Sequence, residues 1–330
     1  MAPRDAPGPR GGRGRGAPHL RAPSRPSGAM KPPDAAVTGT PGVCRLCGAA
    51  LAPEGGFAFG GHRYPRCTGC DVHAATPRPG TGTLEAFYRD RYYALFGPAE
   101  ATARRRAMLR RLVAEIPRRP PGRLLDVGCG AGHLLALARD AGWDVAGVDP
   151  SAEGCALARA QYGLEVTASF LEAADMPDAF FDVITLVNVL DQAPDPALLL
   201  AAARRTLRPG GLLVVRVPNG DFHRAAWRAI RLLPSPVSRR ARSLVVFHSL
   251  CLSAWALRAL LERSGFSRVR VCNAPISGSE WSVPRSAAGR VALACMAALA
   301  RAGAALGAAL TGGRILSSPS LLAYAEREAA

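Results

Sequence analysis

The chain is almost without lysine. Lys31 is the single lysine among 42 basic residues, and arginine supplies the rest. The net charge of +17 would by itself suggest a nucleic-acid partner. However, the arginines accompany heavy use of alanine, of glycine (35 residues) and of proline (28 residues). Compositional bias explains this pattern as well as a binding surface does, so the charge does not lead us to expect a nucleic-acid partner.

The N-terminal region lacks apolar runs. No apolar stretch of about seven residues follows the first methionine, so we expect no secretory signal and a cytoplasmic protein. Residues 1–42 are mostly Pro, Gly and Arg and cannot bury enough surface to offset chain entropy, which predicts a disordered tail. Arg10-Gly-Gly-Arg-Gly-Arg-Gly16 is similar to RNA-binding RGG segments, but an unstructured tail is the simpler interpretation.

The most informative motif is the run from Leu124 to Gly132, Leu-Leu-Asp-Val-Gly-Cys-Gly-Ala-Gly. It predicts a buried strand, a turn and the start of a helix. The glycines permit left-handed backbone angles and close approach to a ligand. Their spacing is G-x-G-x-G and lacks the G-x-G-x-x-G of dinucleotide sites. This argues against a pyrophosphate on the helix N-terminus.

A second strand is predicted to end at Asp149, which stands 21 residues after Gly128. An acidic residue near that distance is placed to accept both hydroxyl groups of a ribose. The two elements together therefore predict a β-loop-α-β unit that binds a nucleoside.

The motifs in this part of the chain resemble class I S-adenosylmethionine-dependent methyltransferases. Asp126–Gly132 and Gly147-Val-Asp149 are similar to the first two family motifs, and further matches follow in order: Phe181–Asn188, Leu207–Gly211, Leu212–Asn219 and Leu260–Phe266. The resemblance spans roughly residues 84 to 328. It implies an α/β, Rossmann-like seven-stranded sheet of order 3-2-1-4-5-7-6, with the last strand antiparallel.

The pattern of the chain allows this fold to be laid out coarsely. We expect a helical linker from Leu84 to Ile116, and strands alternating with helices, as in a mainly parallel sheet. The expected strands are 123–127, 144–148, 164–167, 182–188, 211–217, 267–273 and 321–326, and the expected helices are 132–141, 151–161, 196–207 and 253–264.

The resemblance also implies the residues of the site. The methionine end of S-adenosylmethionine would lie on the backbone of the first motif, the ribose on Asp149, and the sulfonium or carboxylate by Asn188. An apolar wall and a backbone donor after the third strand would meet the adenine. The cofactor-binding set is Asp126, Gly128, Gly130, Gly132, Asp149, Phe170, Leu171 and Asn188. For a general base the candidates are His248 and His223. For each of them, a loop or packing residue is the simpler interpretation.

Two C-x-x-C pairs, Cys44–Cys47 and Cys67–Cys70, have the spacing of a Cys₄ zinc site. Four thiolates suit tetrahedral Zn²⁺, and a reducing cytosol disfavours the alternative of disulfides. His62 and His73 flank the site, and we expect neither to be a ligand. The segment resembles the zinc ribbon that precedes the methyltransferase domain in a bacterial group acting on sugars or other small molecules.

The predicted organisation is a disordered tail (1–42), a zinc ribbon (43–80), a helical linker (81–120) and a methyltransferase domain (121–328) with a helical insertion (285–315). Within the insertion, residues 291–310 are rich in alanine and carry Arg301. We expect an amphipathic helix that packs as a lid or forms a homodimer, with a peripheral membrane contact as the alternative, and not a membrane span.

One departure from the family pattern stands after the fourth strand. Related chains carry Glu-His there, whereas this chain has Asp191-Gln192. A glutamine has no accessible pKa and cannot replace a basic histidine. The cofactor motifs are intact, which favours a methyltransferase with a changed small-molecule acceptor, possible examples being a sugar nucleotide or a secondary metabolite. An RNA methyltransferase and a non-catalytic binding protein are the alternatives.

Overall fold

The computed structural model describes residues 42–77, 81–91, 103–116, 122–242, 245–274, 302–303, 311 and 316–329. The predicted tail, apart from Gly42, lies outside these ranges. So does the predicted insertion 285–315 with its helix 291–310, apart from residues 302, 303 and 311.

The larger of two sheets has seven strands, in the order β6-β5-β4-β7-β8-β11-β10. They are β4 (Arg123–Val127), β5 (Asp144–Asp149), β6 (Val166–Ala168), β7 (Phe181–Val187), β8 (Leu207–Pro218), β10 (Phe266–Asn273) and β11 (Ser320–Arg327). Six strands of this sheet run in one direction, and β11 runs antiparallel to both of its neighbours, β8 and β10. Renumbered along the chain, this is the expected order 3-2-1-4-5-7-6 with an antiparallel last strand, so the prediction of the fold is confirmed.

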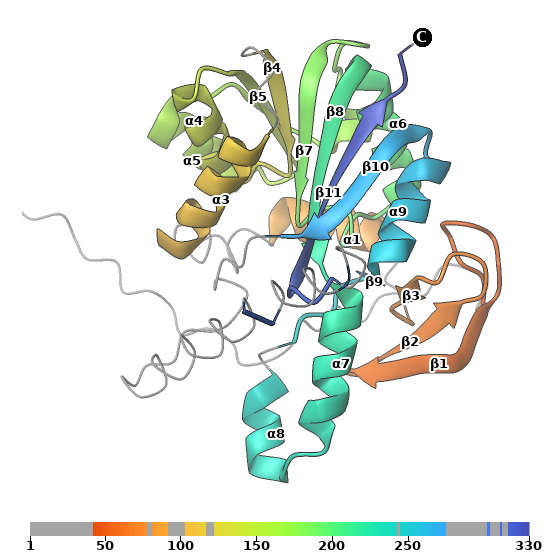
Figure 1. Cartoon of the computed structure of the whole chain (residues 1–330). Coiled ribbons are helices and arrows are strands. Elements are labelled where there is room, and N and C mark those ends of the chain that lie inside the picture. Colours follow the sequence, from red (N-terminus) through yellow and green to blue (C-terminus); the bar gives the residue numbers. More distant parts are fainter. Residues whose placement is uncertain are drawn as a thin grey trace, which may run out of the picture.

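Helices cover both faces of this sheet (Figure 1). One face packs on α3 (Ala103–Glu115), α4 (His133–Asp140) and α5 (Ala152–Tyr162), and the other on α6 (Pro196–Thr206) and α9 (Ala254–Arg263). Local sequence fixes where several helices begin, because the side chains of Ser151, Asp195 and Ser253 accept hydrogen bonds from backbone N–H groups of the first turn.

The expected element bounds hold to within a few residues for most of the sheet. The third strand is β6 at Val166–Ala168, two residues later than its expected start. In place of one helical stretch from Leu84 to Ile116, the described residues contain α1 (Thr81–Asp90) and α3, and residues 92–102 between them lie outside the described ranges.

The second sheet has four strands, in the order β1-β2-β3-β9. The hairpin of β1 (Leu51–Phe59) and β2 (His62–Cys67) and the short β3 (His73–Ala74) come from the predicted ribbon. The fourth strand, β9 (Leu250–Cys251), comes from the segment between β8 and α9, so this sheet joins two distant parts of the chain.

Between β8 and β9 the chain forms two further helices, α7 (Gly220–Arg231) and α8 (Ser235–Ala241), which extend away from the seven-stranded sheet, with α7 beside β1 (Figure 1). Asn219 caps α7, since its Oδ1 accepts from the backbone N–H groups of Asp221 and Phe222. Within the described ranges, no helix combines the length and the apolar content needed to cross a bilayer.

Candidate functional site

The glycine-rich turn after β4 has the left-handed geometry that its sequence predicts. Gly128, Gly130 and Gly132 have φ angles of 73°, 51° and 75°. A β-carbon on Gly128 would lie 2.4 Å from Val189 Cγ2, and one on Gly132 would lie 2.4 Å from Leu164 Cδ1. The turn is therefore restricted to glycine both by its backbone angles and by the packing around it.

Asp149, at the end of β5, holds this turn in place. Its Oδ2 accepts a hydrogen bond from Gly130 N and its Oδ1 accepts one from Ser151 N, each at 2.8 Å. Burial raises the pKa of Asp149, and the two backbone bonds partly offset that effect. A carboxylate has about four acceptor positions. Two backbone bonds therefore leave it able to accept the hydroxyl groups of a ribose.

Asp126 is buried beneath the turn, and its Oδ1 accepts a 2.6 Å hydrogen bond from Thr185 Oγ1 on the neighbouring strand β7. A small pocket opens beside it between α3, the glycine turn and α4. The pocket is lined by Arg105, Leu109, Asp126, Gly128, Cys129, His133, Leu134 and Val187. The first motif thus borders open space, as a ligand-binding turn requires.

After β6, the residues expected to meet adenine form a short 3₁₀ turn, Leu171–Ala173, that Phe170 precedes. Leu171 is buried in the core and Phe170 is half-buried. Ser169 N donates to Asp149 O at 3.1 Å, which ties this turn to the strand that carries the expected ribose acceptor.

Asn188 ends β7 with a φ of 59°. Its Oδ1 accepts a 2.8 Å hydrogen bond from Nη1 of the buried Arg216. The side-chain oxygen is thus engaged with the protein, and the Nδ2 group is the part of Asn188 that can be offered to a carboxylate.

His248 is paired with Asp191. Its Nδ1 lies 2.5 Å from Asp191 Oδ2, the Asp191 side chain is 2% exposed and that of His248 is 23% exposed. Leu250 N also donates to Asp191 O at 2.9 Å. The carboxylate fixes Nδ1 as the protonated nitrogen, which leaves Nε2 as an acceptor on the more accessible side. This is the arrangement of an oriented general base.

The sequence does not identify Asp191 as a site residue, because its histidine partner lies 57 residues further along the chain. Gln192 has a packing role: its Nε2 donates to Asn188 O at 2.8 Å, and its Oε1 accepts from the Tyr88 hydroxyl at 3.2 Å.

His223, the other candidate base, is 1% exposed on α7. Its Nε2 lies 3.0 Å from Pro319 O and its Nδ1 lies 3.3 Å from Val246 N. One ring nitrogen thus donates to a backbone carbonyl and the other accepts from a backbone amide. This geometry gives His223 a structural role, and of the two candidates His248 is the one placed to accept a proton.

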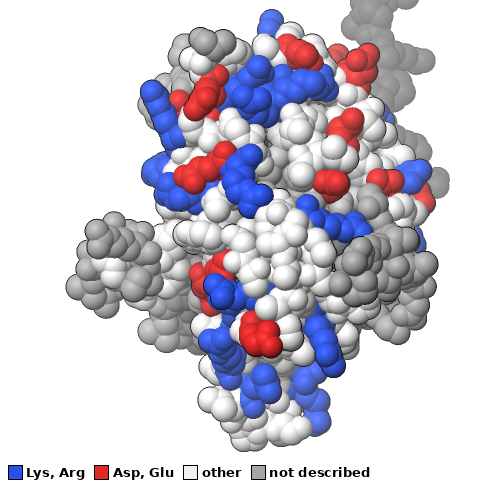
Figure 2. Space-filling view, turned by 90° about the vertical axis from the view of Figure 1, so that its right-hand side faces the viewer, with Lys and Arg blue, Asp and Glu red and all other residues white. Residues whose placement is uncertain are grey.

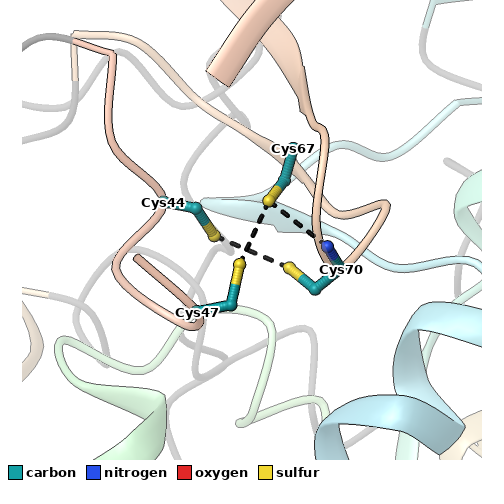
Figure 3. A group of neighbouring side chains, drawn as sticks. All are labelled: Cys44, Cys47, Cys67 and Cys70. Carbon is teal, nitrogen blue, oxygen red and sulfur yellow. Dashed lines mark hydrogen bonds between the residues drawn. The ribbon is translucent and has the colours of Figure 1, made fainter. Parts of the chain in front are cut away.

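The four cysteines of the two C-x-x-C pairs converge on one point (Figure 3). All four Sγ atoms lie within 4.8 Å of one another, with Cys44 and Cys70 at 3.6 Å and Cys47 and Cys67 at 3.3 Å. These separations exclude disulfide bonds, and all four thiols are free. A tetrahedron of Zn–S bonds of about 2.3 Å has sulfur atoms roughly 3.8 Å apart, so the donor set fits zinc.

The ribbon packs directly against the segment that carries His248. Beside the β3–β9 pairing, Ala75 N donates to Ser249 O at 3.0 Å. Phe247 packs between Phe57 and Phe59 of β1, with ring centroids at 4.6 and 5.0 Å. Trp227 of α7 donates from Nε1 to Ala58 O at 3.0 Å. The residues on both sides of His248 are therefore held by the ribbon.

A Rossmann-like sheet, a glycine turn and an acidic residue at the end of β5 define the class as nucleoside-binding α/β proteins. Residues 101–271 match the family model described as "Methyltransferase domain". The chain belongs to this family.

Curated relatives are similar over part of their length. The chain is 36% identical over 106 residues to the ubiquinone biosynthesis O-methyltransferase of Aromatoleum aromaticum, covering 30% of this chain and 45% of that protein. It is 30% identical over 177 residues to the 2-methyl-6-phytyl-1,4-hydroquinone methyltransferase of Synechocystis sp., covering 50% and 51%. The chain spans about half the length of the curated relatives it matches.

Among solved structures, the fold is similar to a chain in the complex between the Haloferax volcanii Trm112 methyltransferase activator and a methyltransferase. The TM-score is 0.52 at 17% identity, and the match covers 74% of this chain and 98% of that one. A likeness at this identity supports the fold alone.

Proposed function

We propose that this protein is an S-adenosylmethionine-dependent methyltransferase that acts on the hydroxyl group of a small molecule. The observation that carries the proposal is Asp149 closing on the glycine turn at the carboxyl end of the parallel strands. Membership of the methyltransferase family and the names of the relatives point the same way.

The first motif would hold the donor. Backbone groups of the glycine turn would bind its methionine end, Asp149 would accept hydrogen bonds from its ribose, and Phe170 would contact its adenine. The side chain of Leu171, expected at the adenine, is instead buried in the core. When bound, S-adenosylmethionine supplies a methyl group that its sulfonium already activates. The protein then has mainly to align the acceptor with that methyl group and to exclude water.

His248 would act as the general base. His248 Nε2 would take the proton of the acceptor hydroxyl group, and the bound donor would supply the methyl group, its sulfur keeping the electron pair of the carbon–sulfur bond. Asp191 keeps the other nitrogen protonated and stabilises the imidazolium that forms. Its Oδ1 is buried and has no hydrogen-bond partner among the described residues.

The choice of a hydroxyl acceptor rests on the base and on the relatives. A base is needed when the nucleophile is a weakly acidic hydroxyl, and several relatives are named O-methyltransferases. Phenolic compounds such as quinols are therefore the first acceptors to test, with sugar nucleotides and other secondary metabolites next. The Cys₄ cluster would hold a structural Zn²⁺ that stabilises the ribbon.

Two measurements test the proposal. Calorimetry should show binding of S-adenosylmethionine and of its demethylated product, whereas no binding at millimolar ligand would refute it. Transfer of a labelled methyl group should then be followed on quinols, sugar nucleotides and a structured RNA. Transfer to RNA and to none of the small molecules would identify an RNA methyltransferase instead. Donor binding without any transfer would favour a non-catalytic binding protein.

A further inference from the structure

The turn between α7 and α8 exposes two adjacent leucines to solvent. Leu232 is 87% exposed and Leu233 is 43% exposed, and they follow directly after the last residue of α7. Of the large apolar side chains in the described residues, Leu232 is the most exposed. An isolated exposed leucine needs no explanation, but two together at the end of a projecting helix pair indicate contact with an apolar phase.

Basic residues outnumber acidic ones around these leucines: the one acidic residue of α7 is Asp221, in its first turn, where it pairs with Arg224. Residues 222–249 contain six arginines and neither Asp nor Glu. Four of them are exposed: Arg228 and Arg231 on α7, Arg239 on α8, and Arg242 directly after α8. Within the described part of the chain, none of these four forms an ion pair with an acidic side chain. Figure 2 shows this end of the molecule, at the bottom of the view, as an uncharged tip below several basic side chains and one acidic patch.

The helix pair is anchored on its inner side. His223, Trp227 and Ile230 of α7 are buried, at the spacing of one helical face. Trp227 and Ile230 belong to the apolar cluster that includes Phe59 and Tyr64 of the ribbon. The leucine tip is therefore carried by a well-packed support and does not have to fold when it meets a partner.

We propose that the α7–α8 tip docks on the surface of an anionic membrane. Leu232 and Leu233 would enter the boundary between headgroups and acyl chains, and the arginines would pair with lipid phosphates. The charge pattern fits this occupant, since a cationic ring around an apolar tip matches an anionic headgroup layer over an apolar core. An RNA would also attract the arginines but would gain nothing from the leucines, and Trp227, an aromatic side chain suited to stacking on bases, is buried.

Docking through the α7–α8 tip would also orient the candidate site toward the membrane. The tip lies at the same end of the molecule as the carboxyl ends of β7 and β8, where the site residues gather (Figure 1). A docked protein would therefore turn that end toward the bilayer, where an acceptor dissolved in lipid is found. The proposal concerns the α7–α8 surface and does not depend on methyl transfer, so either can fail while the other stands.

Co-sedimentation of the full chain with phospholipid vesicles tests the proposal. We expect binding to vesicles that contain phosphatidylglycerol, binding at least about tenfold weaker to pure phosphatidylcholine, and weakening by added salt. The variant Leu232→Ser/Leu233→Ser and the variant Arg228→Gln/Arg231→Gln should each lose about tenfold or more in affinity for the anionic vesicles.

Matched controls are available on other elements. Leu198 of α6 is 56% exposed, and Arg110 and Arg111 of α3 are exposed, so Leu198→Ser and Arg110→Gln/Arg111→Gln should bind vesicles as the parent does. All variants should keep the thermal unfolding midpoint of the parent. No binding to anionic vesicles, or equal loss in the control variants, would overturn the proposal. Binding to a homopolymeric RNA that the arginine variant loses and the leucine variant keeps, with no vesicle binding, would identify a nucleic-acid surface instead.

Discussion

His73 and Cys251 lie opposite each other as antiparallel strand partners, one in the ribbon and the other in the methyltransferase domain. Because His248 stands only three residues before Cys251, the ribbon helps to set the position of the proposed base. The Cys₄ cluster holds together the hairpin from which β3 extends. The metal would thus affect the reaction indirectly, because the ribbon that it stabilises holds the segment that carries His248.

Replacing a cysteine of the cluster tests this relationship. We expect Cys70→Ser to lower the zinc content from one ion per chain to well below one, and to lower kcat by on the order of 100-fold through misplacement of His248. The dissociation constant of S-adenosylmethionine should hardly change, because the glycine turn belongs to the other sheet. Metal analysis, calorimetry and kinetics measure the three quantities. Cys272→Ser, a half-buried position on β10 away from the cluster, serves as the control and should keep its zinc.

The pairing of His73 with Arg224 predicts a dependence of stability on pH. Burial and the nearby guanidinium of Arg224 lower the pKa of His73 from 6.5 to about 4, and Nε2 of His73 lies 2.6 Å from Arg224 Nη1. Gly55 O and Asp71 oppose this shift, and Arg66 adds to it. The folded state therefore favours neutral His73. His73 therefore contributes its full share of the folding stability above pH 6.5, and this contribution is lost as the pH falls toward 4.

Urea unfolding at several pH values checks this effect. The parent should lose roughly 2 kcal/mol more than His73→Gln between pH 7 and pH 5, because only the parent must bury a group that the unfolded chain protonates. The zinc cluster is common to both proteins, so its own response to pH cancels in the comparison. If the free energy of unfolding changed equally with pH in the two proteins, His73 would not titrate in this range.

Asp149 provides a direct test of the donor site. We expect Asp149→Asn to weaken the binding of S-adenosylmethionine by about 30-fold, equivalent to roughly 2 kcal/mol, through loss of charge-assisted hydrogen bonds. Because burial raises the pKa of Asp149, affinity in the parent should begin to fall at a higher pH than an ordinary aspartate would give. Asp144→Asn removes an exposed carboxylate from the opposite end of the same strand. If calorimetry gave the same affinity for both variants, Asp149 would not bind the donor.

His248 should affect the rate without affecting donor binding. His248→Gln is expected to lower kcat by roughly 10²- to 10³-fold while the dissociation constant of S-adenosylmethionine stays that of the parent. Asp191→Asn keeps a hydrogen-bonding side chain but loses the charge, so its kcat should lie between those of the parent and of His248→Gln. His62→Gln changes a histidine on β2 and should leave both kcat and the dissociation constant of S-adenosylmethionine unchanged. Full activity of His248→Gln would assign the proton transfer to another group.

The sequence predicted the elements that depend on local patterns. The bounds of β4 agree with those expected. A short run of buried apolar residues marks the strand, and the glycines after it, which have positive φ angles, mark its end. The two C-x-x-C pairs likewise predicted the sulfur cluster. The helix α7 could have been recognised, because Asn219 caps it and His223, Trp227 and Ile230 recur at helical spacing.

Other features depend on contacts between distant segments and leave no local trace. A two-residue strand such as β9 has no periodicity by which to identify it. The partners of His223 and His248 are backbone groups and a carboxylate far away in sequence, so nothing in the neighbouring residues distinguishes the buried structural histidine from the half-buried one that pairs with Asp191.

The glycine turn allows backbone conformation to be separated from packing. Gly132 and Gly163 both have positive φ angles, 75° and 61°, but a β-carbon would meet Leu164 and Ala158 at Gly132 and nothing within 4 Å at Gly163. Gly163→Ala should therefore cost about 1 kcal/mol of unfolding free energy, from the left-handed backbone alone. Gly132→Ala should cost that amount plus about 1–3 kcal/mol for overpacking, and it should also weaken donor binding, since the turn must shift. Urea unfolding and calorimetry on the two variants measure both effects. Equal costs would mean that the packing around the turn yields freely, and the turn would then not be the rigid cradle that the donor site requires.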